Sequence, residues 1–402
     1  PAMLPQAWGA ASARRRLPRL VPQLAARRSQ QLSTQAEAPL VRLEHGAGGV
    51  SRLTLCRPKK LNSLSLPMIE DLRLKYAGLK AAGAHCVLLA GEGRALCAGG
   101  DVAEVREGVL RGNSYPADFF HSEYTLDYEI ATLHEREGIV QVALWDGIVM
   151  GGGVGLSCHS PIRIATEKTL FAMPETGIGL FPDVGMTHAL SRLGAGPHVG
   201  MFVGLTGQRL GAADCLHAGL ATHFCPSDRL GEVEERLRAL GDKAGDVAAA
   251  SATVREAAGG AKPDTAKAVL MPNAGTIERC FSQGTAEDIV GSLGEEASDW
   301  AKKQREALLG KSPTSVKLSL EAIRRHQAAT LKEAFEMEYR VSQWCMRDQP
   351  DSDFCEGIRA VLIDRDSAPS WSPARLEDVS GERVAGFFAP LAPGHARGEL
   401  RL

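Results

Sequence analysis

The amino-acid sequence predicts an α/β fold with a largely parallel sheet, followed by a helical C-terminal region. Three observations support this prediction. Short β-rich runs alternate with helical patterns over residues 40–227, as in chains that build parallel sheets. Glycine loops separate these runs, and glycine is in excess, with 43 of 402 residues against a usual level of about 7%. Over residues 228–380, long helical patterns replace the alternation.

The individual elements follow from the spacing of the apolar residues. Val50–Leu55 alternates in the way that a strand does. Met68–Leu79 has apolar residues at the spacing of one helix face. Cys86–Ala90 and Val140–Val149 are apolar runs next to glycine, which indicates buried strands. The long helical patterns of the second region are Ala286–Leu309, Ser315–Gln327 and Leu331–Met346.

Both ends of the chain differ from the rest in composition. Residues 1–36 contain no Asp or Glu but six Arg and three Ser, a pattern typical of a mitochondrial transit peptide. We therefore expect this segment to be disordered and to lie outside the fold. A basic arm that is never removed is the alternative. Residues 381–402 contain proline and several glycines, which predicts a flexible tail.

The overall composition excludes several classes of protein. Hydrophobic residues make up 44% of the chain, charged residues make up 23%, and the formal net charge is −2. These values are typical of globular proteins and argue against a chain that is mostly disordered. The small net charge argues against electrostatic binding of the whole chain to nucleic acid or to an anionic membrane. No apolar run reaches the length of about 18 residues that a membrane span needs. The nine cysteines are odd in number and form no CxxC pair, which favours free buried thiols over disulfides or a zinc site.

Two glycine loops follow predicted strands, one at Cys97–Asp101 and one at Met150–Gly155. Because glycine has no Cβ, backbone N–H groups can face outward there, and at a helix start they favour negative charge. Two such loops brought together would form an oxyanion hole. The alternative is that each loop is only a tight turn between a strand and a helix. Neither loop matches the P-loop or the dinucleotide-binding pattern.

Three acidic residues stand among apolar neighbours. Glu175 and Asp183 each follow an apolar run that ends in proline, and Glu123 lies in the aromatic, helical-looking segment Phe119–Tyr124. Burial raises the pKa of a carboxylic acid towards neutrality, where it can exchange protons in catalysis. Taken singly, each acid fits a helix cap or a buried ion-pair partner better than a catalytic role.

The order of these motifs resembles that of the crotonase superfamily, the enoyl-CoA hydratases and isomerases. The matching stretches span about residues 45–380, and Phe171–Gly185 is the most specific of them. The other matches are Leu61–Leu64, Leu96–Val102, Met150–Ser157, Ala165–Lys168, Leu205–Gly207, Gly219–His223, Ser312–Ser315, Met337–Gln343 and Glu356–Asp366. Within the superfamily, the chain is similar to the branch that hydrolyses the thioester of 3-hydroxyisobutyryl-CoA in valine breakdown.

The resemblance implies a crotonase-like spiral of ββα turns with an acyl-CoA substrate lying across it. It also implies roles for five residues. The N–H groups of Gly100 and Gly152 would hold the thioester oxygen, and Glu123 would contact the substrate. Glu175, the catalytic glutamate, would act as nucleophile or as the base that activates water. Asp183 would protonate the leaving thiolate or position the substrate hydroxyl. Gly152, Glu175 and Asp183 would thus also be substrate-binding residues.

One position favours hydrolysis over other crotonase reactions. Hydratases of the superfamily carry a second catalytic glutamate just after their triple glycine, where this chain has Gly155. A hydratase or isomerase activity is the first alternative, and Gly155 argues against it. The second alternative is a non-catalytic component of the small subunit of the mitochondrial ribosome. The presence of both acids and both glycine loops favours the enzyme.

The resemblance also implies the partners and the location of the protein. No cofactor is expected, because coenzyme A is part of the substrate, and no metal is expected either. The predicted partner is an acyl-CoA substrate. We expect neither membrane binding nor direct contact with nucleic acid. Homo-oligomer formation and association with the mitochondrial ribosome stay open. The expected location is the mitochondrial matrix.

Overall fold

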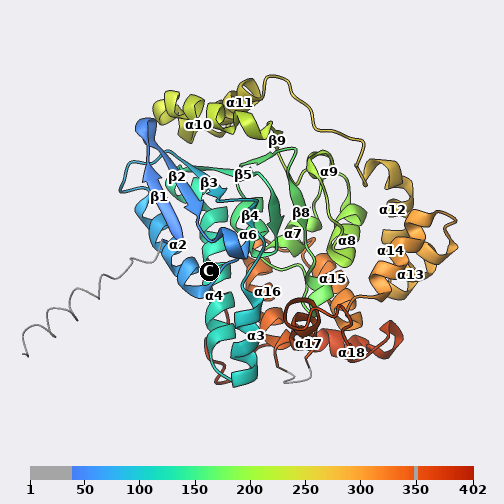
Figure 1. Cartoon of the computed structure of the whole chain (residues 1–402). Coiled ribbons are helices and arrows are strands. Elements are labelled where there is room, and N and C mark those ends of the chain that lie inside the picture. The colour runs from blue at the N-terminus through green and yellow to red at the C-terminus, as the bar shows by residue number, and fades with distance from the viewer. Residues whose placement is uncertain (1–38, 348–351) are drawn as a thin grey trace, which may run out of the picture. The chain divides into compact units, whose positions relative to one another are not determined.

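Two sheets, built largely from parallel strands, lie at the centre of the computed structural model, which describes residues 39–347 and 352–402 (Figure 1). The segment predicted to be a transit peptide lies outside the described residues. The six-stranded sheet has the order β1-β2-β3-β5-β7-β9, and all its neighbouring pairs are parallel except β1 and β2. Its strands are β1 (Val41–His45), β2 (Val50–Leu55), β3 (Cys86–Gly91), β5 (Val140–Trp145), β7 (Ile162–Ala165) and β9 (His223–Phe224).

The three-stranded sheet β4-β6-β8 is parallel and alternates with the larger sheet along the chain. Its strands are β4 (Ala95–Cys97), β6 (Ile148–Met150) and β8 (Leu170–Ala172). From β3 to α7, each turn of the chain therefore adds one strand to the larger sheet, one strand to the smaller sheet, and then a helix. This repeat confirms the predicted α/β fold with a spiral of ββα turns.

Helices cover both faces of the larger sheet, as its continuous apolar strands require. On one face, Leu88 and Val142 pack with Val233 and Val254 of α10 and α11, the two helices at the top of Figure 1. On the other face, Leu89 belongs to the main core of the protein. The helices of the first region are α2 (Leu66–Gly78), α3 (Val102–Arg111), α4 (Tyr115–Ala131), α5 (Leu133–Glu137), α6 (Gly152–Cys158), α7 (Met186–Leu190), α8 (Pro197–Thr206) and α9 (Ala212–Ala218).

The second region is helical, as predicted, and it shares the main core with the first region. Residues 40–402 form one compact unit, so the predicted boundary at 227 separates no independent bodies. The helices of this region are α10 (Leu230–Ala239), α11 (Val247–Ala258), α12 (Ala274–Phe281), α13 (Ala286–Glu295), α14 (Asp299–Leu309), α15 (Pro313–Arg325), α16 (Leu331–Cys345), α17 (Asp353–Ile358) and α18 (Gly381–Gly386). None of the helices in the described part of the chain is both long enough and apolar enough to cross a membrane.

Two predicted elements are each divided in the structure. The run Val140–Val149 forms β5 and β6, because the chain turns at Gly147, where a Cβ would overlap with the backbone of Arg94. The long pattern Ala286–Leu309 forms α13 and α14. Ser298 starts the second helix by accepting a hydrogen bond from the N–H of Ala301. Apolar spacing alone does not reveal these local stops.

The predicted flexible tail over residues 381–402 differs from the structure. The segment contains helix α18 and buries the side chains of Phe387, Phe388 and Leu400. The guanidinium of Arg325 lies 3.9 Å from the centre of the Phe388 ring. The proline and glycine content suggested a loose end, but these three apolar side chains anchor the segment to the helical region.

Candidate active site

Three loops that are distant in the sequence meet at one edge of the smaller sheet. They follow β4, β6 and β8, and they carry Gly99–Gly100, Gly151–Gly152 and Glu175. Because the three strands are parallel, their carboxyl ends lie at the same edge. Ligands of α/β proteins typically bind at such an edge.

The two glycine loops lie directly against each other. A Cβ on Gly99 would be 3.5 Å from the carbonyl oxygen of Met150 and 3.7 Å from the nitrogen of Gly152. A Cβ on Gly151 would be 3.4 Å from the Cα of Gly99 and 3.2 Å from Oε1 of Glu175. The Glu175 carboxyl group therefore lies at the junction of the two loops.

The junction presents free backbone donors. Leu64 fixes the first loop, because its N–H donates to the carbonyl of Gly99 (2.9 Å) and its carbonyl accepts from the N–H of Asp101 (2.7 Å). The N–H of Gly100, between these two bonds, donates to no backbone carbonyl among the described residues. Gly152 is the first residue of α6, where no preceding turn supplies an acceptor. The two predicted oxyanion donors thus belong to adjoining loops.

Glu175 and Asp183 are both buried, and each is 4% exposed. Oε2 of Glu175 has no hydrogen-bond partner in the described structure, whereas Oδ2 of Asp183 accepts from the Tyr124 hydroxyl at 2.5 Å. Burial raises the pKa of Asp183 to about 6, and the Tyr124 hydrogen bond opposes this rise. Burial and the charge of Asp183 raise the pKa of Glu175 well above its usual range. Asp183 is therefore suited to proton exchange near neutral pH, and Glu175 holds its proton to a higher pH than an exposed carboxyl group does.

Glu123 reaches the same place from helix α4. A Cβ on Gly152 would lie closer than 3.0 Å to Oε1 of Glu123, so this carboxyl group occupies the space beside the second glycine loop. Oε1 has no hydrogen-bond partner in the described structure. Burial, followed by the charge of Asp183, raises the pKa of Glu123 well above its usual range. The five predicted site residues are therefore gathered in one region of the fold.

The structure adds Asp127, which the sequence analysis did not select. It lies one helical turn after Glu123 on α4, is fully buried, and leaves both carboxyl oxygens without a hydrogen-bond partner. A Cβ on Gly155 would lie closer than 3.0 Å to its Oδ2. The chain thus places a carboxyl group from α4 beside the position where hydratases carry their second glutamate. In the sequence, the spacing of four residues between Glu123 and Asp127 could have indicated that both acids lie on one face of the same helix.

The segment that carries Asp183 is fixed by the C-terminal helical region. Glu338 of α16 accepts hydrogen bonds from the N–H groups of Gly185 (2.5 Å) and Thr187 (3.1 Å). Val184, which lies between Asp183 and Gly185, has a φ of +57°, a strained conformation for a β-branched residue. Such strain persists only where surrounding contacts hold it. Glu338 lies in the matching stretch Met337–Gln343, and Tyr124 lies next to Glu123, so both had a weak signal in the sequence.

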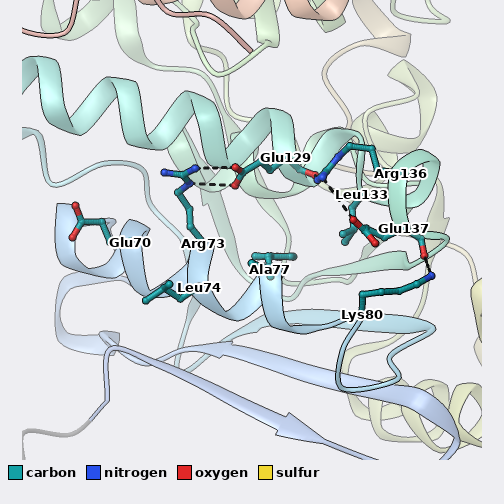
Figure 2. Close-up of a pocket in the computed structure, with 10 residues that line it drawn as sticks. Glu70, Arg73, Leu74, Ala77, Lys80, Glu129, Leu133, Arg136 and Glu137 are labelled. Carbon is teal, nitrogen blue, oxygen red and sulfur yellow. Dashed lines mark hydrogen bonds and ion pairs between the residues drawn. The ribbon is translucent and has the colours of Figure 1, made fainter.

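The described structure also contains a surface pocket of about 560 Å³ between α2 and the corner of α4 and α5 (Figure 2). Several of its charged side chains already have partners. Arg73 pairs with Glu129 at 2.8 Å, and Nζ of Lys80 donates to the carbonyl of Glu137 at 2.5 Å. No predicted site residue lines this pocket. Among residues 39–347 and 352–402, no group of three His, Cys, Asp or Glu side chains is arranged to hold a metal ion.

Comparison with known proteins agrees with this geometry. A family model described as enoyl-CoA hydratase/isomerase matches residues 50–388. The chain is 44% identical over 350 residues to "3-hydroxyisobutyryl-CoA hydrolase, mitochondrial" of Gallus gallus, covering 86% of this chain and 87% of the relative. It is 43% identical over 342 residues to "3-hydroxyisobutyryl-CoA hydrolase 1" of Arabidopsis thaliana, covering 84% of this chain and 88% of the relative.

Solved structures show the same fold. A carnitinyl-CoA dehydratase from Mycobacterium thermoresistibile is 33% identical, with a TM-score of 0.78, and the match covers 89% of this chain and 99% of the other. An enoyl-CoA hydratase from Rhodobacter sphaeroides is 34% identical, with a TM-score of 0.76, and the match covers 90% of this chain and 100% of the other. Both structures thus match nearly the whole described chain.

Proposed function

This chain belongs to the enoyl-CoA hydratase/isomerase family, and from that premise we propose that it hydrolyses 3-hydroxyisobutyryl-CoA to 3-hydroxyisobutyrate and coenzyme A. It is an enzyme with an acyl-CoA-binding fold. The substrate follows from curated relatives that are 40% to 44% identical over most of the chain and carry the name of this hydrolase. The observation that carries the proposal is the Glu175 carboxyl group at the junction of the two glycine loops.

The glycine loops would act on the thioester carbonyl. The N–H groups of Gly100 and Gly152 would donate hydrogen bonds to its oxygen, which becomes negatively charged when the carbonyl carbon is attacked. Each such donor typically contributes about 10²–10³-fold in rate. Since the donors are backbone groups held by the β4–α3 and β6–α6 connections, they need no rearrangement when the charge develops.

The acids would supply the attack and the proton. Glu175 would attack the carbonyl carbon itself, or it would take a proton from the water that attacks. When Glu175 attacks, the C–S bond breaks to leave an acyl–Glu175 anhydride, which water then hydrolyses to the free acid and the Glu175 carboxylate. When water attacks, the C–S bond breaks and the free acid forms directly. In both cases coenzyme A leaves as a thiolate that takes up a proton. Asp183, whose pKa of about 6 lies near neutrality, would deliver that proton or position the substrate hydroxyl. Glu123, beside Gly152, would contact the bound acyl group.

A specific observation favours hydration of a 2-enoyl-CoA as the second candidate function. Adding water across a double bond needs two carboxyl groups facing one water. Gly155 supplies none, but Asp127 of α4 places its carboxyl group in the space beside that glycine. The two reactions are easily separated, because hydration removes the absorbance of the conjugated thioester without releasing a thiol.

Location and partners complete the proposal. The names of the relatives from Gallus gallus, Mus musculus and Homo sapiens indicate the mitochondrion, and we place the enzyme in the matrix. The proposed reaction needs no resident cofactor, because coenzyme A enters as part of the substrate. Self-association and binding to the mitochondrial ribosome stay predictions.

The decisive experiment measures free thiol released by the purified protein from 3-hydroxyisobutyryl-CoA and from a series of other acyl-CoAs. We expect Glu175→Gln to lower the rate of thiol release by at least about 100-fold, since a positioned acid or base typically contributes about 10²–10⁴-fold. The matched control is Glu70→Gln, an exposed residue of α2 that lines the surface pocket. Full activity of Glu175→Gln, or no thiol release by the unmodified protein, would contradict the proposal.

A further inference from the structure

Five carboxyl groups are buried around the glycine loops, and most of them oppose one another's ionisation. They are Glu123, Asp127, Glu175, Asp183 and Glu338. Burial is the main cause that raises the pKa of each, and for four of them the charge of another member adds to it. A group of this kind holds protons at neutral pH, whereas the proposed hydrolysis needs one carboxylate in the charged form.

A cation from the helical region reaches this cluster. Lys311 directly precedes Ser312, the N-cap of α15. The N–H of Ser312 donates to the carbonyl of Thr176 at 3.1 Å, which ties this helix start to the turn Glu175–Ile178. A Cβ on Gly177 would lie 3.2 Å from Nζ of Lys311. The ammonium group therefore lies against the turn that carries Glu175.

Within the described structure, no carboxylate lies close enough to Lys311 to form an ion pair with it. Its side chain is partly buried. Within the described residues, its ammonium group forms no ion pair within 4.0 Å and donates no hydrogen bond. Its electrostatic partner is Glu175: the charge of Lys311 lowers the pKa of that carboxyl group, and the charge of Glu175 raises the pKa of Lys311 against the effect of burial. Charges act over longer distances in a buried environment than in water.

The other ionisable groups near Glu175 work in the opposite direction or act elsewhere. Glu123 and Asp183 both raise its pKa. Asp353 of α17, which packs against the same turn, accepts a hydrogen bond from the Ser312 hydroxyl at 2.5 Å. The Tyr124 hydroxyl stabilises the charge on Asp183 instead. Lys311 is therefore the cation that opposes the effects of burial and of the neighbouring acids on Glu175.

We propose that Lys311 is a positioning residue which, from its place against the turn 175–178, stabilises the charged form of the Glu175 carboxyl group. The inference rests on the proposed function, because it requires Glu175 to act as nucleophile or base. It also assigns a task in the reaction to the helical C-terminal region, which supplies a positive charge beside the turn that carries Glu175.

The test compares the pH dependence of kcat/KM for thiol release in Lys311→Met, Lys311→Arg and the unmodified enzyme. We expect the acidic limb of the Lys311→Met profile to move to higher pH by about one unit, which is a loss of roughly 10-fold below the limb and little change above it. Lys311→Arg keeps the charge and should restore the limb. Lys303→Met, an exposed lysine of α14, is the matched control and should leave the profile unchanged.

A second readout does not depend on turnover. In protein labelled with ¹³C at glutamate carboxyl groups, the Glu175 signal, assigned by its absence in Glu175→Gln, should titrate at higher pH in Lys311→Met than in the unmodified protein. An unchanged titration, or a Lys311→Met profile lowered equally at every pH, would overturn the role of Lys311. Absence of thiol release from the unmodified enzyme would instead refute the proposed function, and the ¹³C titration would still decide on Lys311.

Discussion

The substitution Gly152→Ala tests how closely the second glycine loop packs against helix α4. The new Cβ would lie closer than 3.0 Å to Oε1 of Glu123 and 3.2 Å from Cδ1 of Leu64, so either the carboxyl group or the start of α6 must move. The required shift is on the order of 1 Å, and a misplacement of this size costs about 100-fold in rate. We therefore expect kcat for thiol release to fall by about 100-fold, while the thermal midpoint of unfolding changes little.

Two further variants separate the cause of that loss. Glu123→Ala removes the carboxyl group that the new methyl would strike, so Gly152→Ala combined with Glu123→Ala should be more active than Gly152→Ala alone. Gly78→Ala, in α2, has open space around its Cβ position and should not change the rate. If Gly152→Ala retains activity within about threefold of the unmodified enzyme, the N–H group of residue 152 does not bind the reacting oxygen as we describe.

The remaining predictions concern stability. Burial raises the pKa of Asp127, so the folded state keeps a proton that the unfolded chain releases above a pKa of about 3.9, and the free energy of unfolding falls as the pH rises from there through the folded-state pKa. Asp127→Asn should remove this loss, at about 1.4 kcal/mol per pH unit, so the difference between its thermal midpoint and that of the unmodified protein should grow in favour of the variant as the pH rises above about 5; a constant difference would argue against the protonated acid. Glu338→Ala leaves the N–H groups of Gly185 and Thr187 without an acceptor and should cost about 2–5 kcal/mol in urea unfolding, whereas Glu338→Gln keeps an acceptor and should lose less; equal losses would show that the hydrogen bonds do not matter.

Local chemistry made much of the fold and site predictable. Apolar spacing gave the buried strands of the larger sheet, since it depends only on which side chains face a core. The glycine loops followed from their position after strands, and the resemblance to crotonases supplied the expectation that both loops hold one oxygen. Without that resemblance, Gly100 and Gly152 were two separate turns 52 positions apart, because nothing in either loop specifies that β4 and β6 are neighbours.

The contributions of the helices to the site could not be predicted in the same way. Asp127 follows Glu123 by one turn, but an acid on a helix is more often a solvated residue than a buried one, and only the packing of α4 on α6 decides between these states. Lys311 lies 136 positions after Glu175, and it reaches that residue through the packing of α15 on the turn 175–178, which includes a backbone hydrogen bond between Ser312 and Thr176. Such contacts arise from tertiary packing and leave no local pattern.

Helix α6 shows why the site required a sequence that is poor for a helix. Gly152, Gly153 and Gly155 lie within its seven residues, and each glycine costs a helix about 1 kcal/mol relative to alanine. At all three positions a Cβ would lie closer than 3.0 Å to a neighbour: Glu123 at Gly152, the Cys97 loop at Gly153, and Asp127 at Gly155. The glycines therefore do more than free the N–H groups. They let a strand loop and two carboxyl groups approach one helix start, so the low helix propensity of α6 is a condition for bringing these acids beside the proposed thioester site.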